Sequence, residues 1–155
     1  MSFETTLVLI KPDAIQRNLS GKIINRIENT GLKIVGLKMI KIDKKLAKKH
    51  YQEHQEKPFF ENLVDFISSS PVLAIAISGP NSIQKIRTLM GQTNPLDSPP
   101  GTIRGDYGID LERNLIHGSA NDSDALRELE LFFDKKEIQN FKKSIDEWTG
   151  WTTEA

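Results

Sequence analysis

The sequence predicts an α+β fold in which helices cover one antiparallel sheet. Three observations predict it. The 155-residue chain is the size of one compact domain, strand-like segments alternate with helix-like segments along most of its length, and no internal repeat or low-complexity tract interrupts them. We therefore expect residues 1–155 to form a single domain around one sheet.

The first predicted elements are a strand, a helix and a second strand. Residues 5–10 are apolar and β-branched, as expected of a buried strand. Residues 20–30 carry isoleucines at helical spacing, and Gly31 supplies a stop for that helix. Apolar side chains then alternate over residues 35–39, which predicts the second strand.

A helical insertion follows the second strand. Asp43 is a good N-cap for a helix that extends to His54, and a second helix is expected over residues 60–67. Residues 72–77 are continuously apolar, which is typical of a central strand covered on both faces. A helix from about 81 to 91 comes next, so the sheet gains its third strand and another covering helix.

Residues 92–113 have no convincing period but contain several prolines and glycines, which is typical of a long functional loop. Residues 114–116 are expected to form a short strand that ends at His117, and a last helix starts at Asp122 or Ser123. Its inward residues should be Ala125, Leu126, Leu129 and Phe132. The order is that of a split βαβ arrangement, a ferredoxin-like βαββαβ sandwich with a helical insertion.

Composition argues against several classes of protein. The 21 basic and 21 acidic side chains cancel, which argues against a nucleic-acid partner. There is no cysteine, so disulfides and thiolate zinc sites are excluded. The first apolar run is broken at Lys11, far short of a membrane span, and no basic segment precedes it. We expect a cytoplasmic protein with no membrane partner.

Three cations and a hydroxyl are of the types that a polyphosphate needs. Lys11 follows the first strand, and Arg104 and Thr93 lie in the long loop. Arg87 falls in the stripe of its helix that should face the sheet, where a guanidinium needs an anion or a route to water. Arginine forks grip pairs of phosphate oxygens. The alternative is that each is a long surface side chain, and no glycine-rich phosphate loop accompanies them.

His117 is one of three histidines and is the candidate nucleophile. Neutral imidazole attacks near neutral pH without a separate base, and the phosphoramidate that it forms can pass the phosphoryl group on. Gly118 leaves space beside the ring, and Glu128 in the next helix could accept the other ring N–H and fix the tautomer. The alternative is a hydrogen-bonded structural histidine at a strand end.

The segment Asn-Leu-Ile-His-Gly-Ser at 114–119 resembles the active-site signature of nucleoside diphosphate kinases, Asn-x-x-His followed by small residues. The similarity covers nearly the whole chain, because other segments resemble the family in the same order. These segments are 6–13 (TLVLIKPD), His50-Tyr51, 57–60 (KPFF), 91–95 (GQTNP) and 100–106 (PGTIRGD).

The resemblance implies a role for each candidate residue. His117 would be the phosphorylated nucleophile, and Glu128 would orient it. The phosphates would be surrounded by Lys11, Tyr51, Arg87, Thr93 and Arg104. Asn114 and Lys11 would contact the ribose 3′-hydroxyl, while Phe59 and Leu111 would hold the two faces of the base. Every base offers a π-face, so such binding ignores base identity.

The resemblance also implies the reaction, the cofactor and the assembly. The γ-phosphoryl group of a nucleoside triphosphate such as ATP would pass to His117 and then to a nucleoside diphosphate, in a ping-pong reaction. Mg²⁺ is expected to be carried by the nucleotide phosphates, because the sequence shows no clustered carboxylates to hold it. The protein is expected to be a homo-oligomer, tetramer or hexamer, between which the sequence does not choose.

Two positions depart from the family pattern. Ala120 stands where an aspartate commonly follows Gly-Ser, which bears on how the segment after His117 is held. Lys57 stands where arginine is also frequent, a change that keeps the charge and loses the planar fork.

Three alternative functions remain open at this point. A non-catalytic nucleotide-binding scaffold of the same fold would bind without turnover. A metallopeptidase is suggested by residues 50–54 (HYQEH), an inverted zinc motif, although two histidines at a helix C-terminus are the stronger explanation. An adhesive module is suggested by Arg104-Gly105-Asp106, but no export signal accompanies it.

Overall fold

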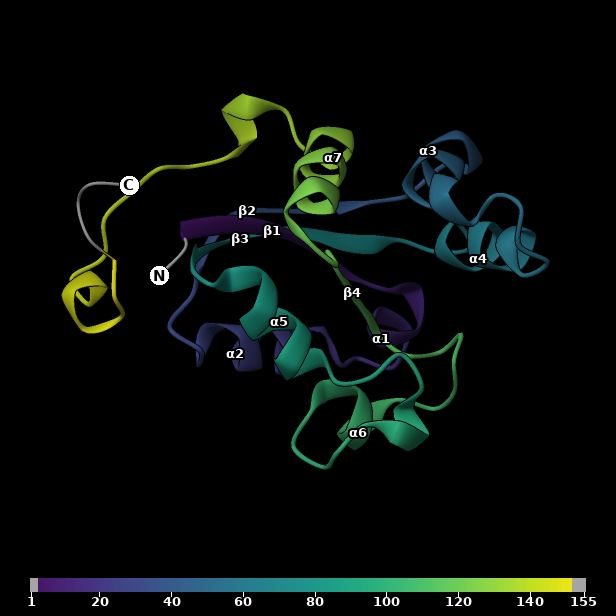
Figure 1. Cartoon of the computed structure of the whole chain (residues 1–155), viewed down its shortest axis with the longest axis horizontal. Coiled ribbons are helices and arrows are strands. Elements are labelled where there is room, and N and C mark those ends of the chain that lie inside the picture. The colour runs from purple at the N-terminus through teal and green to yellow at the C-terminus, as the bar shows by residue number, and fades with distance from the viewer. Residues whose placement is uncertain (1–2, 152–155) are drawn as a thin grey trace.

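A computed structural model describes residues 3–151 and contains one four-stranded sheet (Figure 1). Its strands are β1 (Phe3–Ile10), β2 (Lys33–Ile40), β3 (Val72–Pro80) and β4 (Ile116–Gly118), in the spatial order β2-β3-β1-β4. All three strand pairs are antiparallel. The predicted α+β class and antiparallel sheet are confirmed.

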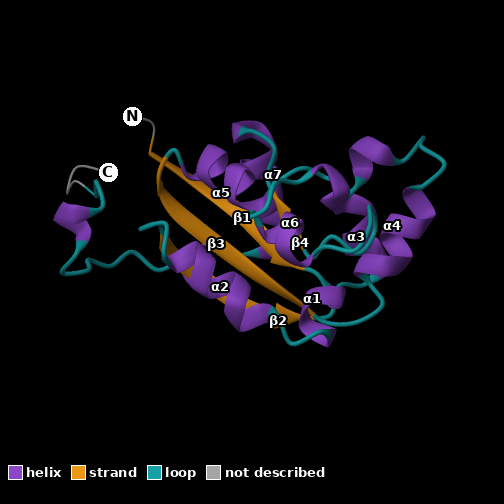
Figure 2. Ribbon diagram, turned by 90° about the horizontal axis from the view of Figure 1, so that it is seen from below, coloured by secondary structure: helices purple, strands orange, loops and turns teal. Residues whose placement is uncertain are grey.

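Helices cover both faces of the sheet because side chains alternate along β1. Val8 and Ile10 face a core completed by α2 (Ser20–Glu28) and α5 (Ser82–Met90). Leu7 and Leu9 face the opposite core, which α3 (Lys44–His50), α4 (Phe60–Ile67) and α7 (Asp122–Phe132) complete. Figure 2 shows β1 and β3 side by side, with α2 in front of the part of the sheet where β2 lies. No described helix is long and apolar enough to cross a bilayer.

The short elements complete the chain. They are α1 (Pro12–Gln16), α6 (Ile103–Tyr107) and four 3₁₀ turns at Gln52–His54, Pro95–Asp97, Lys135–Glu137 and Asp146–Trp148. The helix α3 begins where predicted, because the Asp43 carboxylate accepts a hydrogen bond from the Leu46 amide at 2.7 Å. That helix ends at His50, so the prediction that it reaches His54 is wrong.

The long loop contains more structure than the sequence indicates. The helix α6 lies inside it, with the Thr102 hydroxyl accepting a hydrogen bond from the Gly105 amide as the N-cap. An ion pair between Asp106 and Arg26 of α2 holds this helix against the rest of the molecule. A five-residue helix is too short to show a hydrophobic period, which is why the sequence did not predict it.

Two details around the last strand differ from the prediction. The strand β4 spans Ile116–Gly118 instead of 114–116, because Leu115 has a left-handed backbone (φ 76°) that cannot continue a strand. His117 therefore lies within the strand, opposite Leu9 of β1. In α7, Leu126 is 67% exposed and does not face the core as predicted.

The C-terminal segment passes the end of the sheet (Figure 1). The Gln139 amide donates to the Val35 carbonyl of β2 at 2.7 Å. Farther on, the Trp151 ring packs edge-on against Phe3 and lies 3.8 Å from the Lys33 ammonium. Trp151 thus packs on its own chain.

Candidate functional site

A pocket of about 420 Å³ opens where β4, α5, α7, the helical insertion and the long loop meet. Every residue that the sequence predicts for catalysis or nucleotide binding lines it. These residues are Lys11, Tyr51, Phe59, Arg87, Thr93, Arg104, Leu111, Asn114, His117 and Glu128. The fold thus brings together side chains from six separate segments of the chain.

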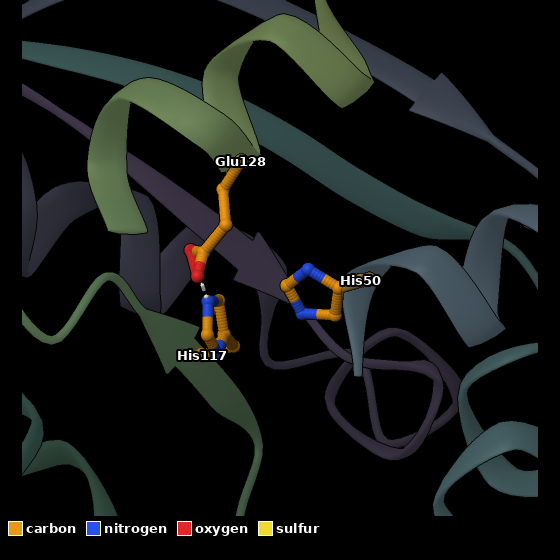
Figure 3. Close-up of side chains that lie close together, drawn as sticks. All are labelled: His50, His117 and Glu128. Carbon is orange, nitrogen blue, oxygen red and sulfur yellow. Dashed lines mark hydrogen bonds and ion pairs between the residues drawn. The ribbon is translucent and has the colours of Figure 1, made fainter. Parts of the chain in front are cut away.

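His117 and Glu128, which both line the pocket, form a direct pair (Figure 3). The Nε2 atom of His117 lies 2.7 Å from Oε1 of Glu128, and the Ser119 hydroxyl donates to the same oxygen at 2.9 Å. Because a carboxylate accepts only, it selects the tautomer with the proton on Nε2. The Nδ1 atom then keeps its lone pair at the other end of the ring, away from Glu128.

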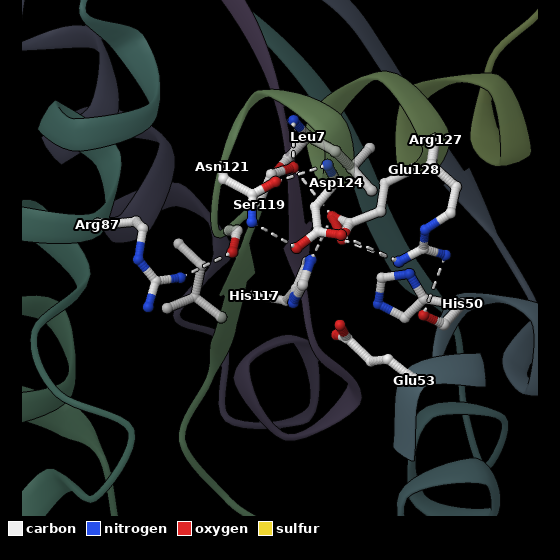
Figure 4. Close-up of polar contacts among 12 residues, drawn as sticks. Leu7, His50, Glu53, Arg87, His117, Ser119, Asn121, Asp124, Arg127 and Glu128 are labelled. Atoms are coloured by element: carbon white, nitrogen blue, oxygen red, sulfur yellow. Dashed lines mark hydrogen bonds and ion pairs between the residues drawn. The ribbon is translucent and has the colours of Figure 1, made fainter. Parts of the chain in front are cut away.

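The Glu128 carboxyl is buried yet remains ionised. Burial raises its pKa, but hydrogen bonds from His117 and Ser119 and the nearby charges of His117 and Arg127 outweigh burial and lower the pKa below its ordinary value. The Arg127 guanidinium lies 3.8 Å from the second carboxylate oxygen (Figure 4). A charged carboxylate is what the imidazole N–H needs as a partner.

Lys11 follows β1 directly and is held by two hydrogen bonds. Its ammonium donates to the Glu112 carbonyl and to Oδ1 of Asn114, each at 2.8 Å. Burial, reinforced by the charge of Arg104, lowers the pKa of Lys11 to about 8, although Asp13 raises it in part. The Asn114 amide nitrogen donates to the Thr93 carbonyl, which ties the long loop to this corner.

Arg104 lines the pocket although it is largely buried, and it holds the backbone around the pocket in place. Its guanidinium donates to the carbonyls of Ile116 at 2.6 Å, Gly91 at 3.3 Å and Asn114 at 3.3 Å. Burial and the charge of Arg87 lower the pKa of Arg104 to about 10, so it is charged at neutral pH.

Arg87 reaches the pocket from α5. Arg87 and Arg127 lie on opposite sides of β4, the strand that carries His117 (Figure 4). The Arg87 side chain is exposed and donates to the Gly118 carbonyl at 3.3 Å. The prediction that Arg87 faces the sheet is therefore wrong, because its side chain lies at the edge of the apolar stripe and extends into the pocket.

Tyr51 supplies a hydroxyl to the pocket. Burial raises the pKa of this hydroxyl, which therefore stays protonated and can donate a hydrogen bond.

An apolar recess of about 410 Å³ adjoins the polar part of the pocket. Phe59 and Leu111, which are 45% and 61% exposed, contribute to both, together with Leu63 and Thr93. An aromatic ring and an aliphatic side chain at the mouth of a recess are suited to holding a flat heterocycle.

A model of the nucleoside diphosphate kinase family matches residues 4–138. The chain belongs to the nucleoside diphosphate kinase family. Among curated relatives, nucleoside diphosphate kinase from Pelotomaculum thermopropionicum is 54% identical over 145 residues, which is 94% of this chain and 97% of the relative. The enzyme of that name from Archaeoglobus fulgidus is 50% identical over 145 residues, 94% of this chain and 96% of the relative.

Solved structures of the family have the same fold. A halophilic nucleoside diphosphate kinase from Halobacterium salinarum in complex with CDP superposes with a TM-score of 0.93 and 47% identity, covering 96% of this chain and 99% of that one. A transition-state mimic of the Borrelia burgdorferi enzyme with vanadate and ADP gives a TM-score of 0.91 and 36% identity, covering 97% and 98%. The predicted family and fold are confirmed.

The departure at Ala120 is accommodated locally. Ala120 is exposed, and the turn after β4 is held by its neighbours. Oδ1 of Asn121 accepts a hydrogen bond from the Asp124 amide at 2.9 Å as the N-cap of α7, and the Ser119 hydroxyl binds Glu128. The second departure, Lys57, is an exposed residue whose ammonium lies 5.6 Å from the Phe59 ring.

The pocket also contains residues that sequence reasoning did not assign to it. The carboxylates of Glu53 and Asp124 line it, as do Met90, Ile116 and Leu63. In the sequence, Glu53 stands out only as part of the HYQEH motif, and nothing in the sequence marks Asp124 as a pocket residue. Their places depend on how α3 and α7 approach β4, which sequence spacing does not give.

Neither rival motif is displayed as its function requires. The zinc motif is interrupted, because α3 ends at His50 and His54 lies in a 3₁₀ turn. The Arg-Gly-Asp tripeptide lies within α6 with Arg104 buried, so the three side chains are not presented on an open loop.

Proposed function

We propose that this protein transfers the γ-phosphoryl group of a nucleoside triphosphate such as ATP to a nucleoside diphosphate, with His117 as the phosphorylated nucleophile. The observation that carries the proposal is the 2.7 Å contact of Nε2 with the buried Glu128 carboxylate, which leaves the Nδ1 lone pair available in a pocket that three cations also line. That lone pair forms the N–P bond. The bond from phosphorus to the bridging oxygen breaks, and its electron pair leaves with the diphosphate. A second diphosphate then takes the group by the reverse path.

The remaining residues have roles that follow from their chemistry. Arg87, Arg104 and Lys11 neutralise the charge that spreads over the phosphates, and the hydroxyls of Tyr51 and Thr93 donate to them. Lys11 and Asn114 form the pair that would meet the ribose 3′-hydroxyl. Phe59 and Leu111 enclose the base without reading its edge. The CDP and ADP of the two related structures are one pyrimidine and one purine, which supports this last role.

Mg²⁺ is best supplied with the nucleotide. Bound to the phosphates, it would neutralise part of their charge during transfer. Among the described residues, the one group of three clustered His, Asp or Glu side chains is His50, His117 and Glu128. Its two nitrogen ligands do not suit Mg²⁺, which prefers oxygen. Two further carboxylates that line the pocket, those of Glu53 and Asp124, offer oxygen ligands of the kind that Mg²⁺ prefers.

Turnover with ATP and GDP tests the proposal against a non-catalytic scaffold. We expect formation of GTP and ADP. Double-reciprocal plots of velocity against ATP concentration, at several fixed GDP concentrations, should be parallel lines, as in a ping-pong reaction. Nucleotide binding with no GTP formation would instead establish the scaffold.

Replacing Glu128 with alanine should slow phosphorylation of His117 by roughly 10²-fold, while ADP affinity stays nearly unchanged. The variant loses the acceptor that selects the tautomer but none of the donors to the phosphates. Rapid-quench labelling with γ-labelled ATP and calorimetry with ADP measure the two effects. The matched control is Glu130→Ala, an exposed glutamate of the same helix. A rate equal to that of the control would remove the orienting role.

The affinity for ADP should fall as pH rises through the pKa of Lys11, which burial lowers to about 8. The lysine is charged below that pH and neutral above it, so the attraction for phosphates is present at pH 7 and is lost towards pH 9.5. The loss approaches roughly tenfold between pH 7 and 9 if only the charged form binds well. Bound phosphate raises the pKa of Lys11, so in the complex the lysine keeps its charge to a higher pH.

Calorimetric titrations with ADP across this range provide the measurement. The control is Lys11→Arg, whose side chain stays charged and should give an affinity that hardly changes with pH. Parallel pH profiles for wild type and this variant would assign the titration to another group.

The cytoplasmic location, the single-domain organisation and the homo-oligomeric state stay predictions. Sedimentation equilibrium would choose between a tetramer and a hexamer.

A further inference from the structure

We propose that His50, His117 and Glu128 form a binding site for a divalent transition metal such as Zn²⁺, and that the bound metal stops phosphorylation of His117 without displacing the nucleotide. The metal site is argued from geometry alone, whereas its effect on phosphorylation rests on the proposed function of His117.

The three side chains converge from three elements (Figure 3). His50 ends α3, His117 lies in β4 and Glu128 lies in α7. One ligand atom from each lies within 4.8 Å of the others, and the two imidazole rings meet edge to face with centroids 4.6 Å apart. Ligand atoms around a tetrahedral zinc ion are about 3.3 Å apart, so each side chain would need to shift by about 1 Å or less.

His50 has no other evident use for its ring nitrogens. It is 2% exposed, and neither ring nitrogen has a hydrogen-bond partner within residues 3–151. Buried polar atoms are nearly always partnered, and an unpartnered one costs free energy. An imidazole nitrogen without a hydrogen-bond partner can give its lone pair to a metal ion without first breaking a hydrogen bond.

The donor set selects the class of metal. Two imidazole nitrogens and one carboxylate oxygen match the ligands of open zinc sites, in which water takes the fourth position. The same set suits Mg²⁺ poorly, because that ion demands oxygen ligands. The Mg²⁺ that accompanies a nucleotide should therefore not compete for this site.

Metal binding would reverse the tautomer that phosphorylation needs. The metal takes the lone pair of Nε2, so the proton that Nε2 carried moves to Nδ1 and no electrons are exchanged. The lone pair of Nδ1, which forms the N–P bond, is then no longer available. The metal would lie at the Glu128 end of the ring, and none of the phosphate-binding cations Lys11, Arg87 and Arg104 belongs to the metal cluster, so ADP and metal can bind together.

The surrounding charges limit the affinity of the site. The Arg127 guanidinium lies 3.8 Å from Oε2 of Glu128, and its charge opposes a dication. Asp124 offsets part of this effect, because its carboxylate lies 3.8 Å from the same guanidinium.

Competition with a chromophoric zinc chelator tests the site directly, on the purified full-length protein without nucleotide. The wild type should bind one Zn²⁺, and His50→Phe, which keeps a flat ring, should bind it at least about tenfold more weakly. The control is His54→Phe, which removes the other histidine of the HYQEH motif and should leave zinc affinity unchanged. His50→Gln, with folding checked by circular dichroism, is the second test if the phenylalanine variant does not fold.

The effect on function is measured by labelling with γ-labelled ATP in excess Mg²⁺ as Zn²⁺ is added. Each protein is normalised to its own zinc-free rate. Zinc should suppress labelling of wild type and His54→Phe but spare His50→Phe, and the affinity for ADP should be the same with and without zinc. Because zinc also binds ATP, equal suppression of all three proteins would overturn the proposal. Loss of zinc binding in His54→Phe, or competition between zinc and ADP, would overturn it as well.

These arms separate the two proposals. Zinc binding to His50, His117 and Glu128 is measured without catalysis. Failure of the protein to become phosphorylated would overturn the proposed function and leave the metal-binding result standing.

Discussion

Replacing His117 with alanine is expected to lower phosphoryl transfer by at least roughly 10⁴-fold, since the variant has no group that can form the covalent intermediate. Labelling with γ-labelled ATP should give an acid-labile, alkali-stable phosphoprotein for wild type and none for the variant. ADP should still bind with similar affinity, because Arg87, Arg104 and Lys11 remain in place.

Two controls make this result specific. His54→Phe should retain the label, which shows that removing a histidine other than His117 does not abolish it. An acid-labile label that persists in His117→Ala would place the phosphoryl group on another residue and end the proposed mechanism.

The second large effect is expected from Gly105→Ala, on stability. A Cβ atom at Gly105 would lie 2.1 Å from the Pro99 carbonyl oxygen and 2.7 Å from the Thr102 hydroxyl. The first contact is with backbone, so α6 must move away from the segment before it. We expect a loss of about 3 kcal/mol or more, which corresponds to a fall in Tm of roughly 6 to 12 °C for a chain of this size.

Scanning calorimetry checks this expectation. The matched control is Gly21→Ala in α2, where an added Cβ meets nothing within 4 Å. Alanine is the better helix former by up to about 1 kcal/mol, so that control should be neutral or slightly stabilising. Equal Tm values for the two variants would show that the long loop tolerates displacement of α6.

The long apolar strands could be predicted because a buried strand needs little more than a continuous apolar run. Residues 72–77 form the core of β3, and residues 5–10 form most of β1. The short elements α1 and α6 could not be predicted in this way. Each has five residues, so it completes too few turns for a period, and each depends on contacts with distant segments.

The site illustrates the same division. The pairing of His117 with Glu128 was predictable because a strand, a tight turn and two helical turns bring residues at this spacing together. The several carbonyls bound by Arg104 were not, since they belong to segments joined only by folding. The contact between His50 and His117 could not be predicted either, because it depends on how α3 packs beside β4. The individual roles of the pocket residues stay predictions.

The location of His117 within β4 has a consequence for metabolism. A side chain on a strand paired with Leu9 has little freedom to follow a substrate, so donor and acceptor must each come to the same fixed point. In the proposed reaction the two half-reactions are then near mirror images. Neither direction is built into the protein, and the net flow of phosphoryl groups is set by the relative supply of triphosphates and diphosphates around it.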